Sequence, residues 1–351
     1  MVSPLDAPYP GRNEIEGERF VSDRRVVVTQ RFFDEATIAY LQDNGCEVVL
    51  ADLPAGQADG GLSHDTLAGM LAGAAGWIVG HAKVTRELQQ ALPDLRIISR
   101  RGVGYERVDL DAARDLGKVV CIAAGGNDAS VADHTLALML AVGHRFRETQ
   151  AKMIDGDFSI LMGRDLFEST VGIIGMGRIG RSVAQRLQGF NCRILAVTEG
   201  ELPQDTPANV EATDLDTLVR TSDYISIHAP LTPETRFLFD ADRIAQMKRG
   251  SFLINAARGG LVDDKALLAA LRDGTIAGAG LDVYLSESDP SYRDVTEQLV
   301  ALPNVIATPH AAASTQEGLA RTNMVAARSV VAVLDGKDPA PETIVADGRT
   351  R

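Results

Sequence analysis

Short apolar runs alternate with amphipathic stretches along most of this chain, as strands and helices do when they follow one another in turn. In the first part, the apolar runs predict strands over residues 25–29, 46–51, 76–79, 96–99 and 118–123. The segments between them have apolar residues at helical spacing and predict helices over 34–44, 63–74, 85–91 and 109–116. This alternation predicts a parallel sheet with helices on both faces.

The pattern changes at Gly125-Gly126-Asn127, which interrupts the alternation. Ser130 is a suitable N-cap for a long apolar helix over 131–145 or beyond. Because this helix is apolar almost all round, we expect it to be buried between domains or subunits.

A second alternating unit begins at Thr170 and predicts six strands in one doubly wound sheet. After the strand at 170, strands are expected over 192–198, 224–229, 251–257, 278–283 and 304–308, with helices over 214–221, 241–247 and 263–272. Asp263 and Asp264 are expected to start the last of these helices by capping and through its dipole. A further helix over 316–334 and a Pro-rich tail close the chain, and residues 1–23 are expected to form a loose arm.

The first strand of the second unit breaks into a glycine turn, Gly175-Met176-Gly177-Arg178-Ile179-Gly180. Gly175 would allow the tight turn, Gly177 a close approach of pyrophosphate, and Gly180 close packing of the helix on the strand. Free N–H groups at the helix start favour the negative charge of a dinucleotide. The next strand ends at Thr198, where a residue that contacts ribose is expected.

The amino-acid composition limits which classes of protein and which partners are compatible with the chain. With 351 residues the chain has room for two domains, and 45% hydrophobic residues with a mean hydropathy of −0.01 predict a soluble protein. We expect a cytoplasmic location, because no run reaches the roughly 20 apolar residues of a membrane span and residues 1–25 lack the apolar core of a signal peptide. The net charge of −13 argues against nucleic acid and anionic membrane as partners. Cys46, Cys121 and Cys192 lie far apart in apolar runs and are interpreted as buried thiols, with no metal site expected.

Three polar residues follow strands of the second unit: Arg258, Glu287 and His310. The carboxyl ends of parallel strands line the ligand crevice, and the glycine turn opens at the same edge. Imidazole can exchange a hydroxyl proton, a carboxylate can hold its tautomer, and a guanidinium can bind a carboxylate. This set suits hydride transfer between a 2-hydroxy acid and nicotinamide, although each residue alone would also fit a structural or solvated role.

The chain resembles the D-isomer-specific 2-hydroxyacid dehydrogenase family, which includes phosphoglycerate, glyoxylate and hydroxypyruvate enzymes. The motifs that carry the resemblance are RGVGYERVDLDAA, NDASVADHTLALML, TVGIIGMGRIG, IHAPLTPET, SFLINAARGGLVDDKALLAAL, AGLDVY and TPHAAAST. It implies an α/β protein of two Rossmann-like or flavodoxin-like domains with parallel sheets and a cleft between them. The implied division is a substrate-binding domain from 1–123 and 311–351, around an NAD-binding domain over 124–310, with hinges near 124 and 310.

The resemblance also implies roles for individual residues. Arg258 would bind the substrate carboxylate, His310 would be the acid/base and Glu287 its partner, with the Val103-Gly104 backbone helping to hold the substrate. The implied cofactor contacts are Gly175, Gly177, Arg178, Ile179, Gly180, Thr198, Ala229, Ala256 and Asp282. Asp282 would contact the carboxamide, with a capping role as the alternative, and the 131–145 helix resembles a dimerisation segment, so a homodimer is expected.

Departures from the family pattern bear on specificity. Glu199 and Glu201 beside Thr198 would repel a 2′-phosphate, so NAD is expected rather than NADP. Gly80-His81 stands where phosphoglycerate enzymes tend to carry Arg-Ser, which weakens the case for a phosphorylated substrate.

Some alternatives stay open at the level of sequence. His81 is either a substrate contact or a surface residue. Arg100 and Arg101 either indicate a substrate with a second acidic or phosphate group or face solvent. Glu287, where formate-oxidising relatives carry Gln, argues against formate. The alternative function is an NAD(H)-binding corepressor or scaffold with little turnover.

Overall fold

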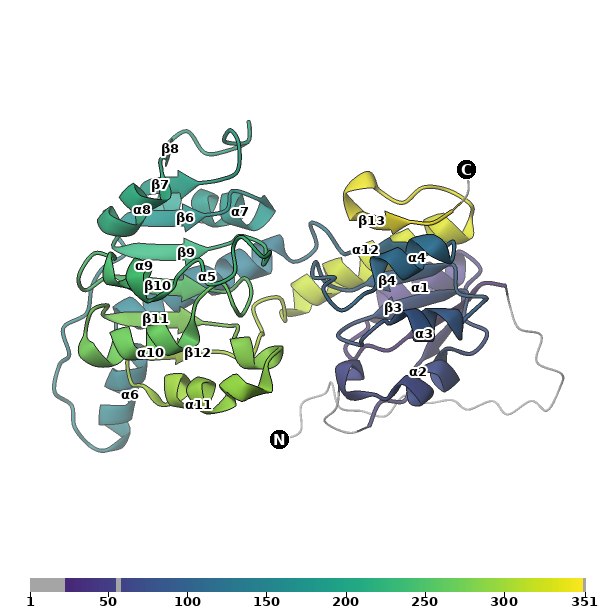
Figure 1. Ribbon diagram of the computed structural model, residues 1–351, viewed down its shortest axis with the longest axis horizontal. Coiled ribbons are helices and arrows are strands. Elements are labelled where there is room, and N and C mark those ends of the chain that lie inside the picture. The colour runs from purple at the N-terminus through teal and green to yellow at the C-terminus, as the bar shows by residue number, and fades with distance from the viewer. Residues whose placement is uncertain (1–22, 55–57, 350–351) are drawn as a thin grey trace.

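The structure, a computed structural model, describes residues 23–54 and 58–349 and contains two parallel-dominated sheets that form two lobes (Figure 1). The arm expected at 1–23 lies almost entirely outside the described residues. In the first lobe the sheet order is β13-β5-β4-β3-β1-β2, and in the second β12-β11-β10-β9-β6-β7-β8. All strand pairs are parallel except β13 with β5, which confirms the predicted α/β class.

The first lobe contains the elements before residue 122 and those after residue 315. Its strands are β1 (Arg25–Val28), β2 (Glu47–Leu50), β3 (Gly76–Val79), β4 (Ile97–Arg100), β5 (Val119–Cys121) and β13 (Ile344–Asp347). Its helices are α1 (Glu35–Asp43), α2 (His64–Leu71), α3 (Arg86–Gln90), α4 (Leu110–Asp115) and α12 (Gln316–Leu334). Each of these five helices begins after an Asp, Ser or Thr whose side chain accepts a backbone N–H.

The second lobe contains the elements between them. Its strands are β6 (Thr170–Ile174), β7 (Arg193–Val197), β8 (Val210–Ala212), β9 (Tyr224–Ile227), β10 (Phe252–Asn255), β11 (Gly278–Leu281) and β12 (Val305–Ala307). Its helices are α5 (Asp128–Gly143), α6 (Phe146–Ile154), α7 (Arg178–Leu187), α8 (Leu215–Thr221), α9 (Ala241–Ala245), α10 (Asp264–Asp273) and α11 (Arg293–Ala301). The order of its strands is that of a doubly wound nucleotide-binding sheet, with β6 at the point where the order reverses.

Each sheet is covered by apolar clusters on both faces. In the first lobe, one cluster joins the sheet to α1 and α12, and the other joins it to α2, α3 and α4. In the second, α5 and α7 cover one face, and α8 to α11 cover the other. The three cysteines, Cys46, Cys121 and Cys192, are buried and free, as predicted.

Several expectations about elements were wrong. The long helix begins at Asp128 after Asn127, so Ser130 lies inside α5 and does not cap it. This helix packs on β10, β11 and β12 of its own lobe and does not lie between the two lobes, while its expected burial between subunits stays a prediction. The sequence analysis also missed β8, α6, α11 and β13, the last of which occupies the expected Pro-rich tail.

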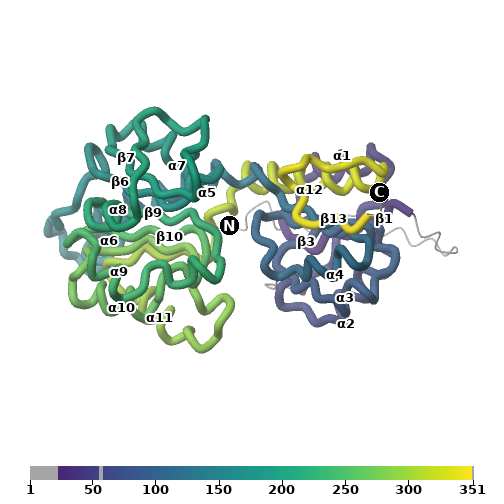
Figure 2. The backbone as a smooth tube through the Cα atoms, turned by 45° about the horizontal axis from the view of Figure 1, so that its top comes forward, coloured from purple at the N-terminus to yellow at the C-terminus, as the bar shows by residue number. Residues whose placement is uncertain are grey.

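The chain crosses between the lobes twice, and the two crossings lie side by side (Figure 2). The Ser130 hydroxyl lies 2.8 Å from the hydroxyl of Thr315, the N-cap of α12. From α12, Arg321 Nε donates to the Gly126 carbonyl oxygen at 3.0 Å and Arg321 Nη2 to Ser130 Oγ at 3.0 Å. The crossings are therefore tied to each other where the lobes meet.

Candidate active site

His310 and Glu287 form a hydrogen-bonded pair at the carboxyl edge of the second sheet. His310 Nδ1 lies 2.7 Å from Glu287 Oε2, while Glu287 Oε1 accepts the Tyr284 backbone N–H at 2.8 Å. The two side chains are 42% and 39% exposed, so the pair is open to a ligand. The hydrogen bond to Glu287 raises the pKa of His310 against the opposing effect of burial. Burial acts to raise the pKa of Glu287, but its bond to His310 and the charge of the imidazolium outweigh this and lower it.

Asp282 fixes the backbone that carries His310. Its side chain is fully buried, and its two carboxylate oxygens accept the N–H groups of Ala311 and Ala312 at 2.8 and 2.9 Å. The His310 N–H donates to the Asp282 carbonyl oxygen at 2.7 Å, and His310 has the left-handed φ of 55°. A left-handed non-glycine residue persists where its surroundings determine it, and Asp282 provides those surroundings. In this structure Asp282 thus has a positioning role, and its contact with a carboxamide stays a prediction.

Arg258 lies where the two lobes meet. Its Nε donates to Glu106 Oε1 of the first lobe at 2.8 Å, and its Nη1 donates to the Ala257 carbonyl oxygen at 2.7 Å. A Cβ added at Gly104 would lie 2.5 Å from Arg258 Nη2, so the glycine lets the Val103-Gly104 loop approach the guanidinium. Burial acts to raise the pKa of Glu106, but the Arg258 charge outweighs it and the pKa is lowered.

His81 joins these groups from the first lobe. Its ring centroid lies 6.3 Å from that of His310, edge-on. The buried carboxylate of Asp59 accepts the His81 N–H at 2.7 Å, and Arg107 Nη1 donates to the His81 carbonyl oxygen at 3.1 Å. Desolvation and then the Arg100 charge lower the pKa of the His81 imidazole. His81 is an exposed residue that lies edge-on to His310, and its role as a substrate contact stays a prediction.

The glycine turn after β6 suits a dinucleotide. Gly175 has a φ of +94°, and a Cβ there would lie 2.7 Å from the His228 carbonyl, while a Cβ at Gly180 would overlap the Gly175 carbonyl oxygen. A Cβ at Gly177 would meet nothing within 4 Å, and Gly177 provides no side-chain cap for the N–H groups at the start of α7. Two of the glycines therefore allow close packing, and the third leaves open space above free N–H groups, where a pyrophosphate is expected.

Three of the other predicted cofactor residues follow β7, β9 and β10, which lie close to β6 in the sheet. Thr198 follows β7, Ala229 lies just past the end of β9 and Ala256 follows β10, while Arg178 and Ile179 open α7. Thr198 and Ala229 are half-buried, Ala256 is buried and Arg178 is exposed. These positions line one edge of the sheet, and their contacts with a cofactor stay a prediction.

Sequence reasoning missed three acidic residues that bind backbone or side-chain groups of the site. Asp59 and Glu106 act as described above, and Asp264 Oδ2 accepts the Leu285 N–H at 3.1 Å in the turn that carries Glu287. Asp263 alone caps α10, which left Asp264 available for this second role. Glu106 could have been noted because it lies two residues after the Val103-Gly104 loop, whereas nothing in the pattern around Asp59 indicated its function.

Within the described residues, no group of three or more His, Cys, Asp or Glu side chains is arranged to hold a metal ion. In the same part of the chain, no helix has the length and apolar character needed to cross a membrane.

Comparison with known proteins identifies the family. Residues 136–312 match the model for the D-isomer specific 2-hydroxyacid dehydrogenase, NAD binding domain. The chain belongs to the D-isomer specific 2-hydroxyacid dehydrogenase family.

Two curated relatives and one solved structure illustrate the similarity. A D-3-phosphoglycerate dehydrogenase of Archaeoglobus fulgidus is 36% identical over 89% of this chain, and the match spans only 58% of that protein. A hydroxypyruvate reductase of Thermotoga maritima is 38% identical over 69% of this chain and 78% of that protein. The structure of a D-lactate dehydrogenase with NAD⁺ from Lactobacillus jensenii has a TM-score of 0.75 and 27% identity, and covers 92% of this chain and 99% of that one.

Proposed function

We propose that this protein is an NAD-dependent dehydrogenase that interconverts a small D-2-hydroxy acid and its 2-keto acid. One observation carries the proposal: the His310–Glu287 pair, Arg258 and an open glycine turn all belong to the carboxyl edge of one sheet. Family membership and the named activities of the relatives support it, including a hydroxypyruvate reductase and a D-lactate dehydrogenase solved with NAD⁺.

In this proposal the residues divide the chemistry between substrate and proton. When bound, the nicotinamide dinucleotide would donate or accept the hydride. In the reductive direction His310 gives a proton from Nε2 to the substrate oxygen, since Nδ1 is held by Glu287. Arg258 binds the substrate carboxylate and stabilises negative charge on the neighbouring oxygen, with the Val103-Gly104 backbone beside it.

The choice of NAD over NADP is supported by the charge after β7. Glu199 and Glu201 are exposed close to Thr198, where the adenosine ribose is expected. Two carboxylates there would repel a 2′-phosphate. We expect a higher kcat/KM with NADH than with NADPH. Replacing both Glu199 and Glu201 with Gln should reduce the ratio of these two kcat/KM values.

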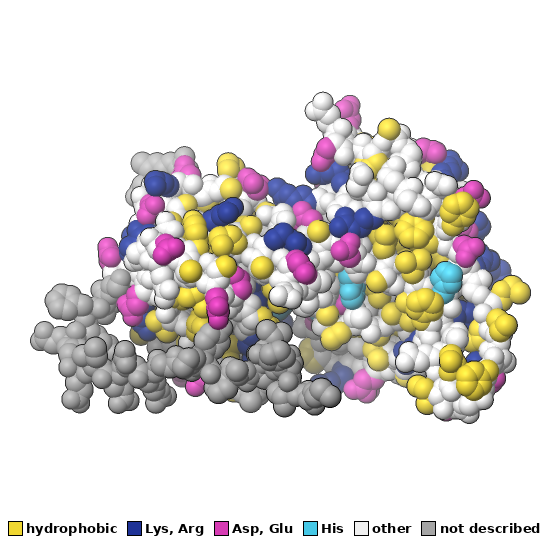
Figure 3. Space-filling model, turned by 180° about the vertical axis from the view of Figure 1, so that it is seen from behind, with side chains coloured by type: hydrophobic (Ala, Val, Ile, Leu, Met, Phe, Trp, Pro, Cys, Tyr) yellow, Lys and Arg dark blue, Asp and Glu magenta, His cyan; other side chains and the backbone are white. Residues whose placement is uncertain are grey.

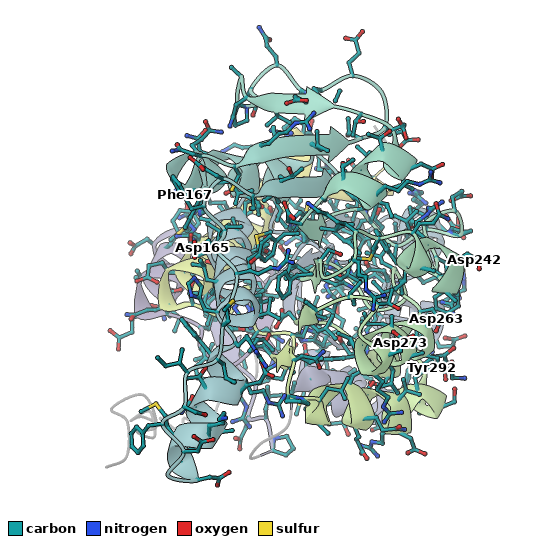
Figure 4. All side chains as sticks on the ribbon, turned by 90° about the vertical axis from the view of Figure 1, so that its left-hand side faces the viewer. Asp165, Phe167, Asp242, Asp263, Asp273 and Tyr292 are labelled. Carbon is teal, nitrogen blue, oxygen red and sulfur yellow. The ribbon has the colours of Figure 1, made fainter. Side chains whose placement is uncertain are left out.

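A homodimer is supported by apolar surface on the second lobe. Large apolar side chains between residues 146 and 167 are exposed by 51% to 95%: Phe146, Met153, Ile154, Phe158, Ile160, Met162 and Phe167. Figure 3 shows apolar side chains gathered on this lobe, and Figure 4 shows Phe167 on one flank, away from Asp263 and Asp273 at the ends of α10. A second copy of this chain would cover such a patch. Light scattering should give a dimer mass, and Ile160→Asp with Met162→Asp should give a monomer.

A cytoplasmic location is supported by the three cysteines. All three are free thiols, which is the usual state in a reducing compartment.

The test is turnover with a panel of 2-keto acids, followed by NADH absorbance. We expect at least one acid to react above about 1 s⁻¹, an ordinary enzyme rate. His310→Ala should abolish this, and Arg258→Ala should lower kcat/KM at least about 100-fold. His64→Ala and Arg272→Ala, which change an exposed His and an exposed Arg elsewhere, are matched controls that should keep wild-type rates. Tight NADH binding with no turnover of any acid would contradict the proposal and favour the corepressor or scaffold alternative.

A further inference from the structure

His134 belongs to a chain of three polar side chains that contacts the backbone around His310. His134 lies on α5, Thr308 directly follows β12 and Asp282 directly follows β11. His134 Nε2 lies 2.9 Å from Thr308 Oγ1, which donates to Asp282 Oδ1 at 2.5 Å. Asp282 Oδ1 is also 3.6 Å from His134 Nε2. Three elements of the second lobe therefore meet at these side chains, which we call the Asp282 cluster.

The hydrogen bonds of the Asp282 cluster determine which ring nitrogen of His134 carries a proton. Both oxygens of Asp282 accept backbone N–H groups, and the Thr308 hydroxyl donates to Oδ1 as well. A hydroxyl group has a single proton, so Thr308 Oγ1 can only accept from His134. His134 Nε2 is therefore the donor in the 2.9 Å contact.

The Asp282 cluster contacts the chain on both sides of His310. Thr308 precedes His310 by two residues, and the two residues after His310 donate their N–H groups to Asp282. His310 itself has a left-handed φ of 55°, and its N–H donates to the Asp282 carbonyl oxygen at 2.7 Å. A left-handed residue other than glycine needs contacts that hold it in place. His134 adds to these contacts from a helix of 16 residues.

Burial makes the hydrogen bonds of the cluster effective. Asp282 is fully buried, and the His134 side chain is only 22% exposed. Hydrogen bonds to a carboxylate in such surroundings are stronger than in water, and consecutive bonds polarise one another. Loss of the His134 donor would remove a partner of the Thr308 hydroxyl and leave it freer to turn away from Asp282.

The arrangement of His310 controls the acidity of its imidazole. The hydrogen bond to Glu287 has the largest effect on the pKa of His310 and raises it, and burial opposes this effect. The Asp282 charge also raises this pKa, whereas the Arg258 charge lowers it. The His81 ring faces the same imidazole at 6.3 Å between centroids. A looser loop would form the bond to Glu287 less often, so the pKa of His310 would fall.

We infer that His134 is a positioning residue: the donor at its Nε2 holds the Asp282 cluster in the arrangement that fixes His310. This inference rests on the proposed function, in which His310 exchanges a proton with the substrate oxygen. Under it, the proton-transfer step depends on α5 as well as on the loops after β11 and β12.

Two substitutions of His134 separate its hydrogen-bond donor from its bulk. His134→Leu removes the donor, and it should lower kcat for the best keto acid about tenfold and leave KM within about twofold of the wild type. His134→Gln has an amide N–H that can replace the Nε2 donor, and it should keep kcat within about threefold of the wild type. His64→Leu is the matched control, because it makes the same change at an exposed His of the first lobe. It should keep the wild-type kcat.

Thr308→Val tests whether His134 acts through the Thr308 hydroxyl. In this background the further change His134→Leu should lower kcat less than about twofold, because residues of one hydrogen-bonded chain are not additive. A full tenfold loss on top of Thr308→Val would overturn the inference.

A second measurement does not depend on turnover. Nuclear magnetic resonance of protein with isotope-labelled histidines should show neutral His134 with its proton at Nε2, in a signal that is absent from His134→Gln. The same spectra should give a lower pKa for His310 in His134→Leu than in the wild type, and a pKa close to that of the wild type in His134→Gln and His64→Leu. A proton at Nδ1 of neutral His134 would overturn the inference.

The outcomes separate this inference from the proposed function. A wild-type kcat and an unchanged pKa of His310 in His134→Leu would overturn the inference, while turnover by the wild type upheld the proposed function. Equal losses of kcat in His134→Leu and His134→Gln would also overturn it, because the bulk of the imidazole would then matter and not its donor. If no acid reacts but the pKa of His310 follows the expected pattern, the positioning of His310 by His134 stands and the proposed function fails.

Discussion

Gly177 and Gly180 lie three residues apart in one turn, yet a methyl group added at each position should affect the stability of the fold differently. A methyl group at 180 would overlap the Gly175 carbonyl oxygen and lie 3.5 Å from Ile173 Cγ2. The overlapped atom is backbone, so the helix itself has to move away from the strand. A methyl group at 177 meets nothing, and Gly177 has an ordinary φ of −66° that alanine readily adopts.

Gly180→Ala should therefore destabilise the second lobe, and Gly177→Ala should not. Overpacking of this kind costs about 1–3 kcal/mol. In a domain of this size that corresponds to a fall of about 2–12 °C in the unfolding midpoint. Gly177→Ala should unfold within about 2 °C of the wild type. Its methyl group would occupy the space expected for pyrophosphate, so the Kd for NADH should rise at least about tenfold.

The assay is thermal unfolding of both variants with and without NADH, combined with an NADH titration by fluorescence. NADH at about ten times its wild-type Kd should raise the midpoint of the wild-type protein clearly more than that of Gly177→Ala. The reasoning is refuted if Gly180→Ala is as stable as the wild type, or if Gly177→Ala binds NADH as tightly as the wild type.

Three further substitutions test the acidic residues of the site. Glu287→Gln should lower the pKa of His310. The pH above which the reductive kcat/KM falls should therefore be lower in this variant than in the wild type. An unchanged pH profile of kcat/KM would exclude Glu287 as the partner that raises the pKa of His310. Burial raises the pKa of Asp264 to about 6, so its ionisation opposes folding as pH rises from about 4 to above 6. Asp264→Asn should therefore stabilise the protein by up to about 3 kcal/mol at pH 8 and by almost nothing at pH 4, and denaturant unfolding at both pH values checks this. Glu106→Gln should free Arg258 from a competing carboxylate and lower the KM of the keto acid about two- to fivefold, and a raised KM would mean that Glu106 supports Arg258 instead.

Secondary structure could be predicted best where several local signals agreed. The helix over 316–334 was expected from its periodicity, and α12 spans Gln316–Leu334 behind the cap Thr315. Local signals were weak at the elements that were missed. The strand β8 has three residues at the sheet edge, and β13 is held by antiparallel pairing with β5, more than 200 residues earlier in the chain. Such pairing depends on long-range contacts that a local pattern does not contain.

The residues of the site also differ in whether local sequence or long-range contacts determine their positions. The strand-end argument indicated that Glu287 and His310 would lie at one edge, and the structure places them 2.7 Å apart. Both follow strands of a single sheet, so topology was enough. The ion pair of Arg258 with Glu106 joins the two lobes, and it depends on how one sheet faces the other. Arg100 Nε and Nη1 are buried without a hydrogen-bonding acceptor among the described residues, because the nearby carboxylates of Asp59 and Glu106 accept other groups, and only coordinates can show this.

The return of the chain to the first lobe has a consequence for the order of folding during synthesis. The apolar cluster on one face of the first sheet includes Ala326, Ala327 and Val330 of α12 together with Val26 and Ile97. When the ribosome has made β1 to β5, α1 covers only part of this face, and the rest stays open until α12 has emerged. The elements from α5 to β12 are contiguous in the chain and complete their own core first.

The lobe encoded second is thus expected to fold first, against the usual N-terminal order. In that interval the nascent chain presents a β-sheet face that only α1 partly covers. This is the stage at which aggregation or the need for a chaperone is greatest.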